Sequence, residues 1–338
     1  MVKKSYNIAV SPNFGGGGIM TYDAAAVSSG LAFLESELEK KDPLLREPLT
    51  AFNYPRDIVV ESGGGWVEAT SAMNVDISMT GGEADAVGGV QNNIRRIQAD
   101  FSKDLYKVLP YEAAMSVKIQ DQLRGAVTGR SIEQVYEDGI RLDYNKYLDI
   151  NTYLGQTKYG TTGIVNDTTV VAASVATGAA SSTLWKNKTA QEILNDVNTM
   201  IVTGWAAAQY DNAAIINHIL IPPAQYSYIN QAILSVTGVN GGISILNYLL
   251  NNNIAKNKGI DLFIGECRFL IGAGSGGTDR MIGYVNDRRF LGMDLPVPLS
   301  RIMTQPNVMS GSYDSLYMGN IGQVKVHYYE PVRYYDGI

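Results

Sequence analysis

Apolar side chains recur every three or four residues between Ser131 and Leu154, a spacing that predicts one long amphipathic helix. Ser131 opens a capping box, because its hydroxyl can accept a hydrogen bond from the amide of Gln134 while the Gln134 side chain reaches back. Such a helix would be roughly 35 Å long at about 1.5 Å per residue, and Gly155 and Gly160 then end it. We expect other layers to pack across this helix. The charged side chains on its opposite side are Asp138, Arg141, Lys146 and Asp149.

Residues 73–80 alternate strictly between apolar and polar side chains, which is the pattern of a β-strand with one apolar face. Ile58–Val60 form a partner run, and the pair predicts a long β-excursion from Pro55 to about Val90. Residues 97–105 alternate in the same way and predict a further strand. An isolated two-stranded ribbon is only marginally stable in water, so it needs a surface, either the chain's own core or a neighbouring subunit. The apolar positions of the first strand are Met73, Val75, Ile77 and Met79.

The remaining elements predict a mixed α+β fold. A helix is expected at Tyr22–Lys41, after a glycine-rich arm. From Thr189 to Pro306, helices and strands alternate in the manner of a compact α/β lobe. Strands are also expected near 112–119 and at Ile321–Val332, and the later one can complete the sheet begun before the long helix. Within the lobe, we predict helices at Thr189–Ala208, Ala224–Leu234 and Ile243–Ile254, and strands at Ile215–Ile221, Leu262–Leu270 and Arg280–Val285.

Composition and charge narrow the function classes. Of the 338 residues, 45% are hydrophobic, which supports a sizeable core, and only 18% are charged, fewer than the usual quarter. The 21 tyrosines suit half-buried and interface positions. The net charge of −6 argues against a conventional nucleic-acid-binding domain, which carries a basic stripe. No secretory signal and no run of roughly 18 apolar residues is present, so we expect a soluble protein with no membrane partner, assembled in a cytoplasm.

Neither histidine is expected to carry chemistry. His218 lies in the apolar run IINHILIP, and His327 lies on a late strand beside tyrosines, so both are interpreted as core residues. The single cysteine, Cys267, excludes a disulfide framework within the chain and is expected to be buried. No HExxH, GxSxG or DxDxDG pattern occurs. We therefore predict no catalytic residue, no metal and no cofactor.

Two further patterns have both a structural and a chemical interpretation. Gly272–Gly277 reads GAGSGG and fits GxGxxG, but a dinucleotide fingerprint needs a helix after it. The following residues, TDRMIGYV, predict a strand, so a hairpin loop is favoured. The densest basic cluster can either contact a phosphate backbone without reading bases, or form a solvated strand face or a salt link between subunits. It consists of Arg95, Arg96, Lys103 and Lys107.

The order of these segments carries a family resemblance. FNYPRDIVV precedes the β-excursion, NTYLGQTKYGTTGIVN ends the long helix, an α/β lobe follows, and VKVHYYEPVRYYDGI closes the chain. In this order the sequence resembles the major capsid proteins of tailed bacteriophages, which have the Hong Kong 97 fold. The last five residues, YYDGI, are similar to the tail of one branch of that family. The resemblance covers nearly the whole chain.

The resemblance implies a division into four parts. Residues 1–53 correspond to an N-terminal arm, and residues 54–90 to an extended β-loop that lies on the neighbouring subunit. Residues 91–168 together with 307–338 correspond to a peripheral domain, and residues 169–306 to an axial domain. The intersubunit contacts implied for the extended loop are Trp66, Met73, Val75, Ile77 and Met79.

The function that the resemblance implies is structural and non-enzymatic. Copies of such a protein form the pentamers and hexamers of an icosahedral phage head that encloses double-stranded DNA, and the protein resides in the virion capsid. Implied partners are the chain itself, a separate scaffolding protein, a portal, decoration proteins and, through non-specific contact, the packaged DNA. Two alternatives stay open. One is the shell of an encapsulin-like nanocompartment, and the other is a nucleotide-dependent enzyme that uses the glycine loops.

Overall fold

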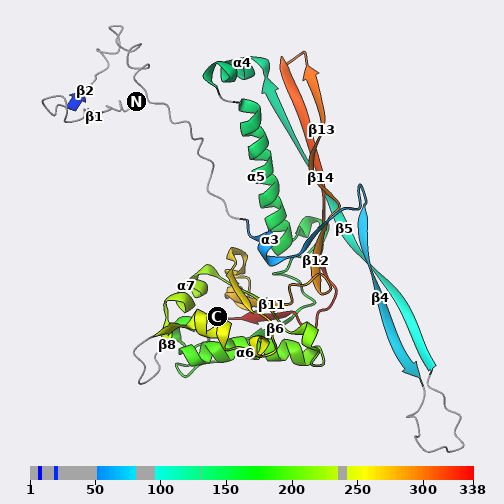
Figure 1. Ribbon diagram of the computed structural model, residues 1–338, viewed down its shortest axis with the longest axis vertical. Coiled ribbons are helices and arrows are strands. Elements are labelled where there is room, and N and C mark those ends of the chain that lie inside the picture. Colours follow the sequence, from blue (N-terminus) through cyan, green and yellow to red (C-terminus); the bar gives the residue numbers. More distant parts are fainter. Residues whose placement is uncertain (1–6, 10–18, 22–51, 81–95, 130, 235–241) are drawn as a thin grey trace, which may run out of the picture. The chain divides into compact units, whose positions relative to one another are not determined.

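The computed structural model describes residues 7–9, 19–21, 52–80, 96–129, 131–234 and 242–338 (Figure 1). Contacts divide the chain into two units, residues 1–50 and 51–338. In the first unit, strands β1 (Asn7–Ala9) and β2 (Ile19–Thr21) pair antiparallel. The helix predicted at Tyr22–Lys41 lies outside the described residues.

A four-stranded sheet runs through the second unit in the order β13–β14–β5–β4. Strand β5 (Arg96–Lys118) is continuous over 23 residues. Its residues 108–118 pair antiparallel with β14 (Ser312–Gly322), and its residues 96–107 pair antiparallel with β4 (Ala69–Thr80). Strand β13 (Val297–Asn307) lies on the other side of β14. The β4–β5 ribbon is therefore a two-stranded extension of this sheet (Figure 1).

This pairing corrects two predictions. The sequence predicts two strands where β5 forms one. It also predicts Ile58–Val60 as the partner of residues 73–80, whereas β3 (Val60–Ser62) lies parallel beside β12 (Leu291–Leu295) in a separate sheet. Strand β15 (Val324–Val326) completes that three-stranded sheet. The strand predicted at Ile321–Val332 does not complete the sheet begun before the long helix. Only its first two residues belong to β14, which pairs with β5, and Val324–Val326 form β15 of the other sheet.

Helix α5 (Ile132–Tyr153) confirms the predicted long helix, and the Ser131 hydroxyl accepts the amide of Gln134 at its N-terminus. Only its second half is buried, where Tyr144, Leu148 and Tyr153 join the core. A shorter helix that the sequence does not predict, α4 (Ile119–Thr128), links β5 to α5.

The prediction that Asp149 lies on the solvent side of the long helix is wrong. Its carboxylate is buried, and Oδ1 accepts the amides of Asn53 at 2.9 Å and Tyr54 at 3.2 Å, at the start of helix α3 (Tyr54–Asp57). Arg268 pairs with Oδ2 at 3.1 Å. A buried carboxylate is tolerated when it is paired and hydrogen-bonded in this way.

A five-stranded sheet with the order β10–β7–β11–β16–β6 forms the centre of the lobe. Strand β16 (Arg333–Asp336) lies between β11 (Arg280–Tyr284) and β6 (Val171–Ser174). The end of the chain thus belongs to the lobe sheet. It is not part of the sheet of β5 and β14, although the resemblance groups residues 307–338 with that part of the chain. The other two strands are β7 (His218–Ile221) and β10 (Phe263–Glu266).

Helices and short turns complete the lobe. The helices are α6 (Ala190–Ala207), α7 (Pro223–Gln231), α8 (Ile245–Asn251) and α9 (Ile254–Asn257), which confirm the three predicted helical regions with the last one divided. Strands β8 (Ile233–Leu234) and β9 (Ile243–Ser244) pair antiparallel. Within the described part of the chain, no helix is both long and apolar enough to cross a membrane. The 3₁₀ turns are Thr157–Tyr159, Trp185–Asn187, Asn212–Ala214, Arg268–Leu270 and Ser275–Gly277.

The five-stranded sheet separates two hydrophobic cores. Leu220 and Ile282 join the core that α5, β12 and β14 also line, whereas their neighbours Ile219 and Met281 join the core beneath α6, α7 and α8. Side chains of successive strand residues point to opposite faces, so one sheet serves both cores.

Helix α6 begins with a complete capping box, in which Thr189 and Glu192 each accept the backbone amide of the other. We expect Thr189→Ala to lower the free energy of unfolding by roughly 1 kcal/mol, because the amide of Glu192 loses its side-chain acceptor. Urea unfolding monitored by circular dichroism measures this loss. Thr189→Ser is the control, because serine keeps a hydroxyl that can accept the same amide. The prediction fails if Thr189→Ala is as stable as the unaltered chain.

Candidate assembly surface

The β4–β5 ribbon has one apolar and one polar face. Its register pairs Met73 with Lys103, Val75 with Phe101, and Met79 with Ile97. Residues that are paired directly across an antiparallel ladder project from the same side of the sheet. The apolar face of the ribbon therefore consists of Ser71, Met73, Val75, Ile77 and Met79 from β4 and Ile97, Ala99, Phe101, Lys103 and Leu105 from β5.

No described residue of the chain buries this apolar face. Met73 and Phe101 are each 79% exposed, and the other large apolar side chains of the face are also exposed. Soluble monomers rarely expose a contiguous apolar surface of this kind unless a partner covers it. The prediction that Met73, Val75, Ile77 and Met79 lie on one face is thus confirmed. That face is exposed to solvent in the single chain.

The opposite face of the ribbon is polar and acidic. Asp76 lies directly across from Asp100, and the Asn74 amide donates to the Asp104 carboxylate at 2.6 Å. Like charges placed directly opposite destabilise a ladder unless water or a cation screens them. This face is therefore suited to solvent, and the apolar face to a protein surface.

The basic residues that the sequence places together do not share a face. Arg96 lies on the polar face at the far end of β5, whereas Lys103 lies on the apolar face. Lys107 donates to the carbonyl oxygen of Tyr159 at 2.8 Å. Arg95 lies outside the described residues. A contact of these side chains with DNA or with another subunit stays a prediction, but the three described ones do not form a single phosphate-binding patch.

A run of three glycines joins β3 to the ribbon. Gly63, Gly64 and Gly65 all have positive φ values, 129°, 115° and 74°, which side-chain-bearing residues rarely adopt. The amides of Gly63 and Gly65 bond to the carbonyls of Leu295 and Pro296. Trp66 follows directly and is exposed. The sequence signal for this junction is the SGGGW run itself.

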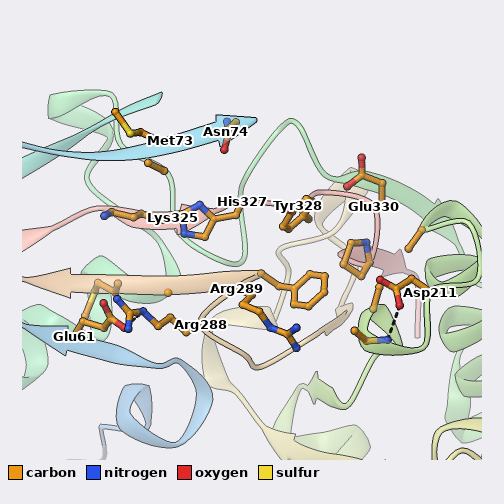
Figure 2. Close-up of a pocket in the computed structure, with 18 of the residues that line it drawn as sticks. Glu61, Met73, Asn74, Asp211, Arg288, Arg289, Lys325, His327, Tyr328 and Glu330 are labelled. Carbon is orange, nitrogen blue, oxygen red and sulfur yellow. Dashed lines mark hydrogen bonds and ion pairs between the residues drawn. The ribbon is translucent and has the colours of Figure 1, made fainter. Parts of the chain in front are cut away.

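A groove of about 990 Å³ lies at the base of the ribbon. Figure 2 shows Met73 and Asn74 of β4 on one side of it, with Lys325 and His327 facing them. The three Lys and Arg side chains that line the groove are already paired, Lys325 with Asp294, Arg288 with Glu61 and Arg289 with Asp287. Burial and the nearby Lys325 lower the pKa of His327, which keeps its ring neutral at neutral pH.

The groove therefore offers neither an unpaired cluster of positive charge nor an acid–base pair. His327 lines it half-buried, so the prediction of a core histidine is wrong at this position. Across the described residues, no group of three or more His, Cys, Asp or Glu side chains is arranged to hold a metal ion.

His218, in contrast, is the core histidine that the sequence predicts. It is buried, and its Nε2 lies 3.1 Å from Oδ1 of Asp57, at the end of α3. Asp57 is fully buried and also accepts hydrogen bonds from Arg56 and from the Tyr153 hydroxyl of α5. Its backbone carbonyl accepts the hydroxyl of Tyr284 at 2.6 Å. We call these five side chains the Asp57 network.

The Asp57 network fixes the segment that leads into the ribbon. It joins α3 to α5, to β7 and to β11, so the ribbon departs from a rigid base. Burial alone would raise the pKa of Asp57, but hydrogen bonds from His218, Arg56 and Tyr153 outweigh burial and lower it. Sequence reasoning missed this network, because its partners come from four separate parts of the chain.

The glycine loop at Gly272–Gly277 is not a nucleotide cradle. It contains a 3₁₀ turn and leads into strand β11 rather than a helix, which confirms the loop interpretation. The carboxylate of Asp336 holds the loop by accepting the amide of Ser275 at 2.8 Å, and it pairs with Arg280 at 2.7 Å. The loop is thus packed against the end of the chain. Cys267 is buried, as predicted.

Comparison with known families identifies the chain. The family model described as Major capsid protein matches residues 82–338, which is well over half of the sequence. The chain belongs to the major capsid protein family. A search of curated protein sequences finds no match.

Solved structures that resemble this capsid protein are phage and phage-like capsids. The capsid of Myoviridae phage XM1 is 19% identical, with a TM-score of 0.72 over 90% of this chain and 98% of that one. The capsid of the empty GTA particle is 9% identical, with a TM-score of 0.62 over 92% and 98%. Gordonia phage Cozz is 14% identical, with a TM-score of 0.53 over 97% and 98%. These likenesses establish the fold, the α+β capsid fold of the Hong Kong 97 type.

Proposed function

We propose that copies of this chain form the pentamers and hexamers of an icosahedral phage head that encloses double-stranded DNA. The observation that carries the proposal is the amphipathic β4–β5 ribbon, whose apolar face is exposed in the single chain. The membership of the chain in the major capsid protein family agrees with this role. The protein then acts as a structural component and not as an enzyme.

The ribbon needs a second copy because it cannot be stable alone. Each strand of twelve residues is about 40 Å long at about 3.3 Å per residue, and a free two-stranded ribbon is marginal in water. Fully burying one Val, Ile, Met or Phe side chain contributes roughly 1.5–3 kcal/mol. A neighbour that covers Trp66, Met73, Val75, Ile77 and Met79 would therefore stabilise both the ribbon and the assembly. Obligate interfaces of this kind bury on the order of 2,000–5,000 Å².

The charge of the chain fits a container for DNA. A chain with a net charge of −6 does not bind the DNA phosphates strongly, so packed DNA is held by enclosure rather than by binding. We propose that any contact with DNA is non-specific. A separate scaffolding protein, a portal and decoration proteins are the further partners of this role, and the virion capsid, assembled in the host bacterial cytoplasm, is its location.

Two alternatives are less well supported. An encapsulin-like nanocompartment would use the same fold but hold enzyme cargo, and the family match favours the phage head. A nucleotide-dependent enzyme would use GAGSGG as a phosphate cradle. That loop leads into a strand and is held by Asp336, so the helix N-terminus that a dinucleotide requires is missing there.

Electron microscopy of the full chain tests the proposal, with the chain expressed alone and together with a scaffolding partner. We expect shells, tubes or capsomers after size-exclusion chromatography, because the exposed ribbon drives association. The nucleic-acid content of shells that form in infected cells then separates a phage head from a nanocompartment, which would carry a bound cargo peptide instead. A chain that remains a monomer under both conditions contradicts the proposal.

A further inference from the structure

Strand β6 leaves one edge of the five-stranded lobe sheet open. It stands last in the strand order and pairs only with β16. The amide of Val175 donates to the carbonyl of Asp336, so the backbone groups of Ala173 and Val175 point toward β16, whereas those of Ala172 and Ser174 point outward. No described residue of the chain bonds to these outward groups. We call the outward N–H and C=O groups of Ala172 and Ser174 the β6 edge.

Apart from its short length, the β6 edge has none of the features that usually prevent strand pairing. Natural edge strands are protected by charged side chains, by proline or by an element that covers them. The sequence of β6 is VAAS, and all four of its residues are exposed. Such an edge can accept one more strand from another chain, through main-chain hydrogen bonds.

Arg333 of β16 lies beside this edge. It is directly across from Val171 in the register of the two strands, so both side chains project from the same face of the sheet. That face is covered by α6, because the hydroxyl of Tyr335, two residues further along β16, lies 3.0 Å from the hydroxyl of Thr203. Val171 is exposed, whereas Arg333 is only 9% exposed.

The Arg333 guanidinium is buried without an acidic partner. It has five N–H donors, and its only acceptors among the described residues are two backbone carbonyls, those of Val332 at 2.9 Å and Tyr329 at 3.5 Å. Burial therefore lowers the pKa of Arg333. The buried Lys188 of the same lobe has the carboxylate of Asp196 at 2.6 Å, which is the usual arrangement for a buried charge. The missing carboxylate beside Arg333 points to an anion from outside the chain.

We infer that the β6 edge and Arg333 together bind an extended acidic peptide segment of another protein. The segment adds to the sheet beside β6, and its backbone bonds to Ala172 and Ser174. A Glu or Asp side chain on the face of Val171 then meets the guanidinium. The added strand and β16 are about 10 Å apart, at about 4.8 Å between neighbouring strands, and an Arg and a Glu side chain together span that distance. In this mode the main chain supplies affinity and the carboxylate supplies specificity.

Other occupants satisfy only half of the site. A second copy that pairs its own β6 with this one would supply no carboxylate to either Arg333, since β6 contains none. A phosphate group would meet the guanidinium and leave the backbone groups of the β6 edge unpaired. An acidic strand satisfies both, and its binding does not depend on the chain forming a shell.

Synthetic peptides test the charge requirement on the full chain. The probe is a short fluorescein-labelled peptide of Ser, Thr and Val with one central Glu, and its partner has Gln in place of that Glu. By fluorescence anisotropy, we expect the Glu peptide to bind about tenfold more tightly than the Gln peptide. Arg333→Gln should abolish this preference without weakening the Gln peptide. Equal binding of the two peptides to the unaltered chain, or no binding of either, overturns the inference.

A proline in β6 tests the contribution of the edge. Ala172→Pro removes an outward amide, so it should weaken both peptides alike, while the subunit stays folded because that amide has no partner within the chain. Ala172→Val is the matched control, since it keeps the amide and should bind both peptides normally. Hydrogen exchange of the segment that contains β6 should slow when the Glu peptide binds. Unchanged exchange in the presence of bound peptide overturns the edge contact.

Val171→Glu tests whether Arg333 lacks a carboxylate. Val171 is 57% exposed, so its replacement removes little packing, and the new carboxylate lies beside the guanidinium. We expect the folding equilibrium constant to be about fivefold higher than for the control Val171→Gln. The preference for the Glu peptide should also disappear, because the site is then filled from within. Equal stability of the two variants in urea unfolding overturns the inference.

The remaining outcomes identify a different occupant. Inorganic phosphate or duplex DNA that displaces the Glu peptide, and whose binding is lost in Arg333→Gln, would assign the guanidinium to phosphate. A dimer of the unaltered chain that Ala172→Pro dissociates would assign the β6 edge to a second copy. Either result overturns the acidic peptide. All of these measurements use the unassembled subunit, so their failure leaves the proposed function intact, and a failure of shell assembly leaves this site unaffected.

Discussion

Phe101→Asp is expected to abolish assembly while the subunit stays folded. Phe101 is 79% exposed in the single chain, so its replacement removes little packing within the subunit. In a shell the ring would be buried on a neighbour, and its loss would cost roughly 2–3 kcal/mol at each contact. Burying an unpaired carboxylate adds a cost of several kcal/mol. The effect recurs at every equivalent contact of a closed assembly, so shells should be undetectable by electron microscopy.

Gln98→Asp is the matched control for this substitution. Gln98 lies on the polar face of the same strand, across from Ser78, so a new carboxylate there remains in water. We expect normal shells from this variant, and circular dichroism should be unchanged for both proteins. If Gln98→Asp blocks assembly as completely as Phe101→Asp, the negative charge of the ribbon is responsible, and burial of its apolar face is not.

The ribbon could be predicted because its information is local. Strict alternation in residues 73–80 and 97–105 fixes which side chains share a face, whatever the strand pairs with. The long helix was predictable for the same reason, since Ser131 caps it and its apolar positions have helical spacing. Both elements stay interpretable in isolation, and the ribbon carries the proposed assembly surface.

The continuity of β5 was not predictable, because Pro110 reads as a strand breaker. Pro110 pairs with Asn320 of β14, while the pairing of β4 ends at Lys107. At Pro110 one edge of β5 is therefore free of β4, and a missing backbone donor on a free edge costs little. Whether a proline sits at an edge depends on which strands pair beside it, and the local sequence does not contain that information.

The buried polar groups were not predictable for a related reason. Asp149 and Asp57 look like surface charges within their own segments, yet both are buried and receive donors from distant residues. The position of the chain end was not predictable either, because β16 inserts between β11 and β6 of the lobe. Asn53 and His218 lie more than ninety residues from Asp149 and Asp57, and β6 lies more than ninety residues before β16, so periodicity carries no signal of these contacts.

Asp57→Ala is expected to lower the free energy of unfolding of the isolated subunit by about 3–5 kcal/mol. The substitution removes the acceptor that Arg56, His218 and Tyr153 share. Arg56 keeps Glu266, but the buried His218 ring and Tyr153 hydroxyl lose their partner, and each unsatisfied buried group costs about 1–3 kcal/mol. Urea unfolding at neutral pH measures the loss. Glu266→Gln is the control, because Glu266 pairs with the same Arg56 but its side chain is 40% exposed, so its loss should cost less than about 1 kcal/mol.

The pH dependence of this difference identifies its cause. The pKa of Asp57 is lower in the folded chain than the ordinary value of 3.8, so the folded state favours the ionised carboxylate. Its contribution to stability is therefore fully present above pH 3.8 and is lost as the pH falls through the folded-state pKa. Asp57→Ala has no such carboxylate, so the gap in unfolding free energy between the two proteins should be constant from neutral pH down to about pH 5 and shrink below pH 3.8. A gap that does not shrink in acid would mean that the Asp57 side chain stabilises the base of the ribbon through packing. Packing, unlike the hydrogen bonds of an ionised carboxylate, is not lost when the carboxylate is protonated.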